Sequence, residues 1–300
     1  MASLRHMGAL AADASEAGRA VASQPFWYHT MELAPGVVTP GWFDLRPIVD
    51  RLPWPDVSGK RCLDVGPYDG FLSLELERRG AAKVVATDIG DPSEWDWAYR
   101  DRKTGPMAIA GMRGAEPGRG FEIAKRILGS KVERVEINAY DLTPERLGIF
   151  DVVVCGSLML HLRDPVRALE AVRGVCGEWF LSAETISPLL SLLARRTAVA
   201  RMRGGERGQW LIPNVAGHRQ LLASAGFEIE RTVRPYAIPF GPAHPARSRG
   251  RLASWDHLFT SIVARGVGVP HAAALCRPIA DNSTGPAAGD GDVPLLDLGT

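Results

Sequence analysis

Short apolar runs alternate with segments of helical periodicity along the middle of the chain. Five runs of five or six residues have the length and composition of buried strands: Arg61–Val65, Lys83–Thr87, Val132–Ile137, Phe150–Cys155 and Trp179–Ala183. Strands that alternate with helices form βαβ units around a mostly parallel sheet. The pattern therefore predicts an α/β protein whose ligands bind at the carboxyl ends of the strands.

The remaining periodic segments complete a two-sided architecture. Two further apolar runs bring the predicted sheet to seven strands, and helices are expected on both of its faces in a Rossmann-like arrangement. The runs are Phe227–Val233 and His271–Cys276, and the helices begin at Phe71, Phe121, Asp164-Pro165 and Asn214. Asp164 suits an N-cap and Pro165 suits the first helical turn.

Both chain ends and one insertion fall outside this alternation. Residues 1–24 are predicted to be an N-terminal arm with a weak Ala-rich helix, and a short helix is expected from about Phe43 to Leu52. The main domain spans residues 25–280, with a helical insert of about Pro188 to Arg203 inside the segment 187–210. Residues 281–300, rich in Gly, Pro, Asp and Ala, are expected to be a disordered tail.

The composition limits the classes of binding partner and the cellular compartment that we expect for the protein. The net charge of +1, from 35 basic and 34 acidic side chains, gives no overall field that would attract a polyanion, so nucleic acid is an unfavoured partner. No apolar run approaches the roughly 20 residues that span a bilayer, and no secretory signal is visible, so no membrane partner is expected. The four cysteines show no CxxC spacing, which disfavours a zinc site and favours a reduced, cytoplasmic protein. The oligomeric state is left open.

The sharpest motif joins the first predicted strand to its helix in the segment Leu63–Phe71. Gly66 and Gly70 allow a tight turn and a close approach of the backbone to a ligand. A dinucleotide site uses G-x-G-x-x-G, but these glycines have G-x-x-x-G spacing with Asp69 between them. An acid at this place would repel a pyrophosphate and attract an ammonium group. The loop therefore favours S-adenosylmethionine (SAM) over NAD, and it resembles motif I of the class I methyltransferases.

The acids at the strand ends support the same interpretation. Asp64 ends the first strand, and Asp88 ends the second, just before Ile89. A carboxylate at the second position accepts hydrogen bonds from both ribose hydroxyls of an adenosine. A generic Gly-rich turn between strand and helix is the alternative.

The segment Asn138-Ala-Tyr-Asp141 follows the third strand. In proteins with motif I this position meets the adenine, so the resemblance implies that Asp141 accepts from the adenine amino group and that Tyr140 stacks on the ring. An ordinary loop with a turn-forming Asp is the alternative.

Further segments resemble a narrower family, typified by the bacterial wobble-uridine tRNA (carboxy)methyltransferases, over roughly residues 25–235. Those enzymes have a much longer N-terminal extension, whereas about two dozen residues precede Trp27 here. The chain is more similar to a small-molecule branch, the geranyl pyrophosphate C6-methyltransferases of benzastatin-type biosynthesis. The resemblance rests on Trp27–Thr30, Pro40–Asp44, Cys155–His161 with Arg163–Pro165, and Trp210–Asn214.

This resemblance implies a prenyl pyrophosphate substrate, methylation of an alkene carbon, and Mg²⁺ on the pyrophosphate, with the metal ligands unassigned. Attack by an alkene leaves a carbocation, which requires an apolar, aromatic pocket and a base that removes a proton. The resemblance puts Glu170 first as the base, although its place in a helix fits a solvated side chain equally. Glu184, which ends the fifth strand, is the second candidate.

Other candidates lie around the acceptor side. His161 follows the fourth strand and is expected to orient the base or bind pyrophosphate, with a buried structural role as the alternative. Tyr28 and His29 are expected to close over the cofactor as a lid, and Trp210 to shape the far end of a prenyl pocket; packing is the alternative for all three. Arg201, on the insert, is a candidate for clamping the pyrophosphate, unless it is simply a solvated cation.

Three other functions remain open. The first is a wobble-uridine tRNA methyltransferase, and the second is a small-molecule O-methyltransferase in which His161 removes a hydroxyl proton. The third is a SAM-binding protein without catalysis, which the complete set of acids in the cofactor region disfavours.

Overall fold

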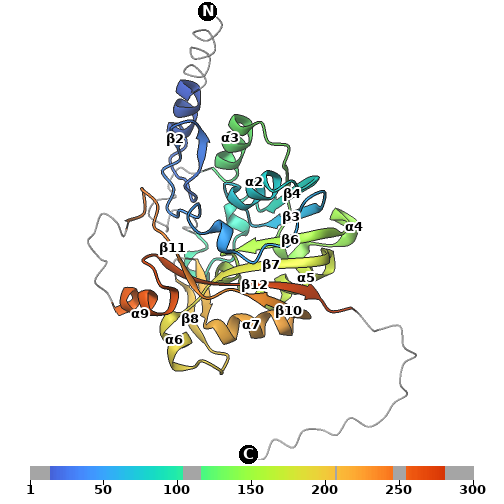
Figure 1. Cartoon of the computed structure of the whole chain (residues 1–300), viewed down its shortest axis with the longest axis vertical. Coiled ribbons are helices and arrows are strands. Elements are labelled where there is room, and N and C mark those ends of the chain that lie inside the picture. Colours follow the sequence, from blue (N-terminus) through green and yellow to red (C-terminus); the bar gives the residue numbers. More distant parts are fainter. Residues whose placement is uncertain (1–13, 104–115, 207, 246–254, 281–300) are drawn as a thin grey trace, which may run out of the picture.

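The computed structural model describes residues 14–103, 116–206, 208–245 and 255–280. At its centre is a sheet in the order β10-β12-β7-β6-β3-β4-β5, with β11 also paired to β12 (Figure 1). Strands β7, β6, β3, β4 and β5 are parallel, and β12 runs antiparallel to both of its neighbours in that order. The predicted Rossmann-like, mostly parallel sheet with helices on both faces is confirmed. Its strands are β3 (Arg61–Val65), β4 (Lys83–Asp88), β5 (Glu133–Glu136), β6 (Phe150–Gly156), β7 (Cys176–Thr185), β10 (Phe227–Thr232), β11 (Tyr236–Ile238) and β12 (Val269–Pro278).

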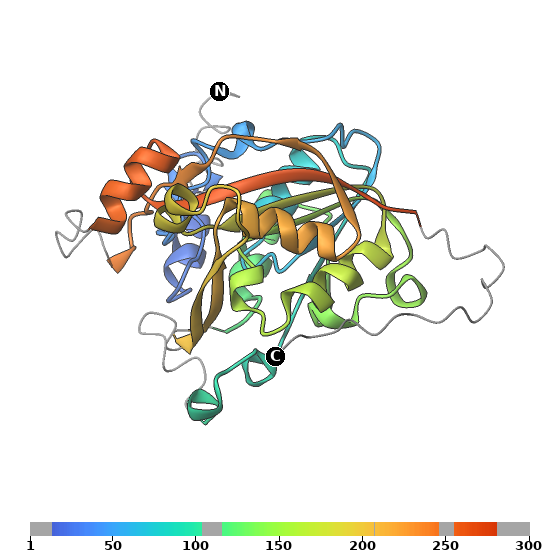
Figure 2. The same ribbon diagram turned by 90° about the horizontal axis from the view of Figure 1, so that it is seen from below.

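Side chains along the strands alternate between two apolar cores, one on each face of the sheet. Cys62 and Leu63 are neighbours on β3, yet they point to opposite faces of the sheet, as the pleat requires. One core contains residues of α2 (Phe71–Arg78) and α3 (Arg119–Leu128) together with the N-terminal arm. The other contains residues of α5 (Pro165–Val175) and α7 (Val215–Ser224), which lie along one face in Figure 2 beside the short α4 (Pro144–Leu147).

The predicted helical starts agree with the structure. Asp164 accepts a hydrogen bond from the backbone N–H of Arg167 at 3.1 Å, so it is the N-cap of α5 with Pro165 in the first turn. Asn214 caps α7 in the same way, accepting from the N–H of Gly217 at 2.6 Å.

The predicted helical insert is wrong in its second half. Helix α6 (Pro188–Leu193) ends early, and the chain then forms a hairpin of β8 (Ala200–Glu206) and β9 (Gln209–Pro213). The buried side chain of Asn214 explains the change, because its amide donates to the carbonyls of Ala194 at 2.7 Å and Thr197 at 2.9 Å. These contacts hold the segment in a non-helical path that the local pattern does not show.

The segment before the sheet also differs from expectation. A helix does cover residues 14–22, but the predicted helix from Phe43 to Leu52 is only a 3₁₀ turn, Val49–Arg51. Strands β1 (Glu32–Ala34) and β2 (Val37–Val38) form a small hairpin that the sequence did not indicate. Helix α9 (Trp255–Ala264) was not predicted either. The predicted tail, 281–300, lies outside the described residues. The domain limits remain a prediction.

Candidate active site

The loop between β3 and α2 turns through three residues with positive φ. These are Gly66 at 74°, Tyr68 at 55° and Gly70 at 90°, the last being the N-cap residue of α2. A Cβ on Gly70 would lie 2.7 Å from the ring of Phe121 on α3, so glycine is required there both by the backbone and by packing. The loop thus brings the first turn of α2 close to the ends of β3 and β4.

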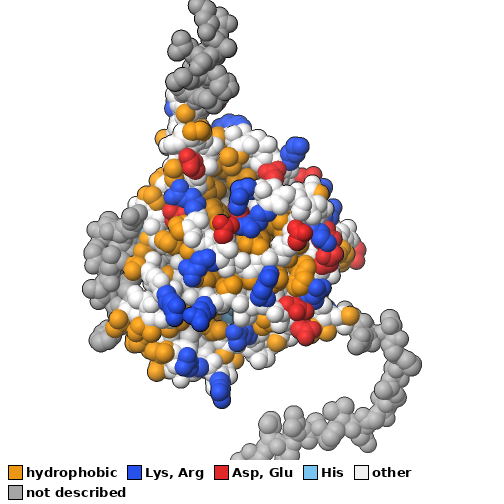
Figure 3. Space-filling view, viewed as in Figure 1, with side chains coloured by type: hydrophobic (Ala, Val, Ile, Leu, Met, Phe, Trp, Pro, Cys, Tyr) orange, Lys and Arg blue, Asp and Glu red, His pale blue; other side chains and the backbone are white. Residues whose placement is uncertain are grey.

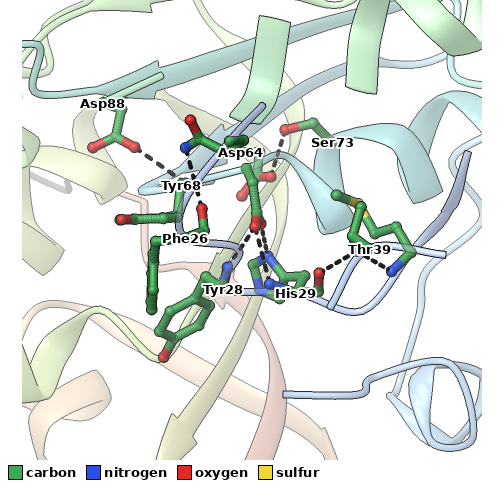
Figure 4. Close-up of polar contacts among 11 residues, drawn as sticks. Phe26, Tyr28, His29, Thr39, Asp64, Tyr68, Ser73 and Asp88 are labelled. Carbon is green, nitrogen blue, oxygen red and sulfur yellow. Dashed lines mark hydrogen bonds and ion pairs between the residues drawn. The ribbon is translucent and has the colours of Figure 1, made fainter. Parts of the chain in front are cut away.

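Two of the predicted cofactor acids lie beside this loop (Figure 4). Asp64 is buried and accepts from the Ser73 hydroxyl at 2.6 Å; burial raises its pKa to about 7, although the Ser73 hydrogen bond opposes the shift. Asp88 accepts from the N–H of Ile89 at 2.8 Å and from the N–H of Tyr68 at 3.1 Å. Burial also raises the pKa of Asp88, against the pull of its two backbone donors.

Asp69 joins the loop to the N-terminal arm, a name used from here on for the described residues 14–44, beyond the predicted limit at residue 24. One carboxylate oxygen accepts from the backbone N–H of Tyr28 at 2.7 Å and from that of His29 at 2.9 Å. Its other oxygen faces Nδ1 of the His29 ring. Tyr28 and His29 therefore do lie over the cofactor loop, as a lid would. Because the arm engages both oxygens of Asp69, its expected role as partner of the cofactor ammonium remains a prediction.

The adenine-side candidates are brought to the same edge of the sheet. Asn138 caps the 3₁₀ turn Ala139–Asp141 by accepting from the N–H of Tyr140 at 3.1 Å. The Tyr140 hydroxyl donates to Asp96, and the guanidinium of Arg167 lies 5.2 Å from its ring, so protein groups already contact part of this side chain. Asp141 is exposed, and one of its carboxylate oxygens lies 3.9 Å from the guanidinium of Arg167.

Glu184 is the buried carboxyl group of the acceptor side. It lies at the end of β7 and accepts from the backbone N–H of Met159 at 3.1 Å and, more weakly, of Leu158 at 3.4 Å. The Cys155 thiol lies 3.8 Å away. Burial raises the pKa of Glu184 to about 8, and the backbone donors oppose this shift only in part. The group can therefore exchange a proton near neutral pH.

Two tyrosines, Tyr28 and Tyr236, lie within electrostatic reach of this carboxyl group. Burial is the main cause of the raised pKa of both phenols; for Tyr28 the charge of Asp69 comes next, and the charge of Glu184 adds to the shift of both. The Tyr28 ring is 4.8 Å from that of Phe43 and 5.4 Å from that of Tyr68. Sequence reasoning missed Tyr236 and Tyr68, although Tyr68 lies inside the motif that identified the cofactor loop.

His271 is a buried polar residue near Thr185 that the sequence analysis did not identify. Nε2 of His271, on β12, lies 2.7 Å from the Ser157 hydroxyl and 3.1 Å from the Thr185 hydroxyl, while Nδ1 donates to the carbonyl of Val269 at 2.9 Å. Burial lowers the pKa of His271 to about 4, so the ring is neutral and Nε2 accepts. Only the pairing of β12 with β7, distant in sequence, brings these residues together.

Glu170 is not among the buried polar groups described above. It is exposed on α5, and this helix runs back along the sheet from its N-cap at Asp164, away from the carboxyl edge. The apolar residues of α5 pack against the sheet, and Glu170 lies beside them in an exposed position, so its role as the base remains a prediction.

The other acceptor-side candidates lie near the hairpin. Nδ1 of His161 donates to the carbonyl of Gly208 at 2.8 Å, and burial lowers the pKa of this ring. Nε1 of Trp210 donates to the carbonyl of Asp96 at 2.7 Å, and Arg163 lies 4.8 Å from its ring. Both side chains thus fasten the hairpin to neighbouring loops, and a contact with substrate remains a prediction for each.

A cavity of about 220 Å³ opens next to Thr185, the residue after Glu184. Its polar lining includes the side chains of Thr185, Arg201 and Gln209. Apolar walls come from α6, β9, β12 and Phe240. The predicted pyrophosphate ligand Arg201 is exposed and lies at this cavity.

The charges of the site suit a cationic ligand. Asp88 raises the pKa of Asp64, and Asp69 raises that of Asp88, so these carboxyl groups lie within electrostatic reach of one another. A positive ligand relieves such repulsion. SAM carries a sulfonium and an ammonium, and the binding of its aminoacyl, ribose and adenine parts beside the loop, Asp88 and Asp141 remains a prediction.

Curated relatives agree with this chemistry. The chain is 28% identical over 188 residues to a ubiquinone biosynthesis O-methyltransferase of Pseudomonas aeruginosa, covering 56% of this chain and 69% of that protein. The enzyme of that name from Pseudomonas entomophila is 30% identical over 158 residues, covering 50% of this chain and 56% of the relative. The chain is a SAM-dependent methyltransferase. No protein-family model matches it.

Solved structures similar to this methyltransferase have low sequence identity to it. One is 1,6-didemethyltoxoflavin-N1-methyltransferase of Burkholderia thailandensis with bound S-adenosylhomocysteine, with 15% identity, a TM-score of 0.47, and coverage of 79% of this chain and 78% of that one. Another is a SAM-dependent methyltransferase from Mesorhizobium loti, with 15% identity, a TM-score of 0.43, and coverage of 75% and 93%.

The described residues contain no group of three or more His, Cys, Asp or Glu side chains that would hold a metal ion. The predicted Mg²⁺ therefore has no cluster of protein ligands in this part of the methyltransferase, and we derive no step through it. Within the same residues, no helix is both long enough and apolar enough to cross a bilayer.

Replacing Asp69 tests how the arm is attached. D69A leaves the N–H groups of Tyr28 and His29 without their acceptor, so we expect a loss of about 2 kcal/mol in unfolding free energy and weaker SAM binding. Urea denaturation and calorimetric titration measure the two effects. D141A, at an exposed acid of the adenine-side loop, is the matched control for stability. Unchanged stability of D69A would contradict the attachment.

The raised pKa of Glu184 predicts a pH dependence of stability. The folded protein binds this proton more tightly than the unfolded chain, whose glutamate pKa is near 4.5. The resulting stabilisation is complete below that value and is lost as the pH rises towards 8. E184Q removes the titration, so its stability relative to the parent should increase by at least about 1 kcal/mol from acidic to mildly alkaline pH. Denaturation curves at both pH values measure it. E170Q, at an exposed site, should show no such change, and a flat difference for E184Q would refute the prediction.

Proposed function

We propose that this methyltransferase transfers the methyl group to an alkene carbon of a prenyl pyrophosphate, such as C6 of geranyl pyrophosphate. The observation that supports this most directly is the buried carboxyl group of Glu184 at the end of β7, which accepts from the backbone N–H of Met159 and lies within electrostatic reach of Tyr28 and Tyr236. A carbocation next to such rings is attracted to their π-faces, and a carboxylate beside them can remove its proton.

Bound SAM supplies an electrophilic methyl group at the carboxyl edge of β3 and β4. The alkene electron pair forms the new carbon–carbon bond, and the sulfur–methyl bond breaks with its electrons remaining on sulfur. The carboxylate of Glu184 then takes a proton from the carbon beside the cation, which restores a double bond. A positive charge nearby favours the ionised form of Glu184, so the base is ready when the site is loaded.

Residues around the cavity next to Thr185 would hold the acceptor. Its apolar walls suit a prenyl chain, and Arg201 at its edge suits a diphosphate group, which a guanidinium can bind through two hydrogen bonds. Trp210 and His161 lie on the hairpin side and would limit the length and position of the chain. Mg²⁺ would enter with the pyrophosphate rather than on a protein cluster.

O-methylation of a small molecule is the second candidate, favoured by the names of the curated relatives. In that reaction Glu184 would take a hydroxyl proton of the acceptor, and the same aromatic walls would contact an aromatic or prenylated ring. A wobble-uridine tRNA substrate has no comparable support, because the chain has a net charge of only +1.

Replacing the two candidate bases separates their roles. We expect E184Q to lose at least about a hundredfold in turnover while it still binds SAM, because an amide cannot take the proton. E170Q should retain full turnover, since its side chain is exposed on α5. Single-turnover methyl transfer with the accepted substrate measures both. Full activity of E184Q, or loss in E170Q alone, would overturn the assignment of the base.

A panel of acceptors tests the substrate class. Release of S-adenosylhomocysteine is measured with geranyl pyrophosphate and Mg²⁺, with a catechol, and with bulk tRNA, and the products are weighed by mass spectrometry. We expect a product heavier by one methyl group from geranyl pyrophosphate, with the new bond on carbon. Turnover of the catechol alone would establish the O-methyltransferase alternative, and turnover of tRNA alone would exclude both small-molecule proposals.

A further inference from the structure

Apolar side chains are exposed together on α6 and α9, far from the cofactor loop. On α6, Leu193 is 73% exposed, and on α9 Leu258 and Ile262 are 50% and 55% exposed. The two helices pack against each other. Leu258 and Ile262 are four residues apart, so they lie on one face of α9. Figure 3 shows apolar side chains gathered at the lower left, where Figure 1 places these helices.

Arginines follow both helices. Arg195 and Arg196 come directly after α6, Arg265 comes directly after α9, and all three are exposed. None of the three forms an ion pair with another residue that the structure describes. From Ser187 to Gly226 the sequence has six arginines and a single acid, Glu206, although the whole chain has a net charge of only +1. We call Leu193, Leu258, Ile262 and these three arginines the α6–α9 surface.

We propose that the α6–α9 surface binds the face of an anionic lipid membrane. Exposed leucine and isoleucine side chains would enter the boundary between head groups and acyl chains, and the arginines would contact the lipid phosphates. Both helices are short, which fits a segment that lies on a bilayer and does not cross it. The earlier expectation of no membrane partner rested on the absence of a spanning run and did not consider this surface.

Charge makes a membrane a better occupant than a second copy of the chain. A two-fold interface brings the same surface of both copies together, so the arginines of one copy would approach those of the other. An anionic bilayer instead neutralises them. A nucleic acid would also attract the arginines, but it offers no apolar region for Leu193 or Ile262.

The α6–α9 surface lies beside the cavity next to Thr185. Pro188 of α6 and Thr260 of α9 line the cavity next to Thr185, so the two helices that form the surface also form part of the cavity wall. A membrane-bound protein would thus hold this cavity near the acyl chains, from which an acceptor with an apolar tail could enter. Membrane binding itself does not depend on the proposed prenyl substrate.

Vesicle flotation of the full chain tests the proposal, with phosphatidylcholine vesicles that contain or lack phosphatidylglycerol. We expect binding to the anionic vesicles that weakens at high salt. L193S/I262S and R195Q/R196Q should each reduce the partition coefficient more than about tenfold. L128S and R126Q, which alter an exposed leucine and arginine at the end of α3, are the matched controls and should bind as the parent does.

Three results would overturn the proposal. Equal binding by the parent and the α6–α9 variants would show that another surface contacts lipid. Absence of binding to anionic vesicles, with a dimer that L193S/I262S converts to monomers in light scattering, would assign the surface to self-association. Loss of tRNA binding in R195Q/R196Q without any vesicle binding would assign it to RNA. Methyl transfer to soluble acceptors by L193S/I262S is measured separately, so that failure here is distinguished from failure of the proposed reaction.

Discussion

The attachment of the N-terminal arm to Asp69 is the contact on which the rest of the site depends. One buried carboxylate accepts from two successive backbone N–H groups of the arm and faces the ring of His29. The arm is thereby fixed over the turn between β3 and α2, and the ring of Tyr28 is placed against those of Phe43 and Tyr68. A second attachment comes from the segment after β11, where Phe43 forms a bridge with Phe240 and the N–H of Asp44 donates to the carbonyl of Pro239 at 2.9 Å. A residue of the cofactor motif thus also builds the acceptor side.

Binding of a cationic cofactor is expected to change the protonation of the buried carboxyl groups of the site. Burial raises the pKa of Asp64 and Glu184 to about 7 and about 8, so neither is firmly ionised when it is surrounded only by protein. A cationic ligand lowers both values, because it favours the charged form of its neighbours. Cofactor binding is then expected to release protons and to leave Glu184 ionised. In its ionised form the carboxyl group of Glu184 can accept a proton.

The sequence analysis predicted those parts of the fold that are determined by residues close together in the chain. The apolar runs of β3, β4, β6 and β7 and the caps of α5 and α7 were predictable because each is determined by residues a few positions apart. The β8–β9 hairpin was not, since the amide of Asn214 determines the path of residues around Ala194 and Thr197 from about twenty positions away. In the same way, the motif identified Asp64, Asp69 and Asp88, whereas the approach of His271 to Ser157 and Thr185 depends on strand pairing across the sheet.

The two candidate glutamates differ in where the topology of the sheet places them. Glu170 and Glu184 are both acids close to predicted element boundaries, and the resemblance put the first ahead of the second. In a parallel sheet, however, the carboxyl end of a strand faces the ligand, and the helix that follows returns towards the opposite edge. A residue in the second turn of such a helix moves away from the site with each step along the chain, while the last residues of a strand stay in it. Glu184 is the next-to-last residue of β7, whereas Glu170 lies within α5, so the topology favours Glu184 as the candidate; it is also the buried one of the two and accepts from the backbone of the Leu158–Met159 loop.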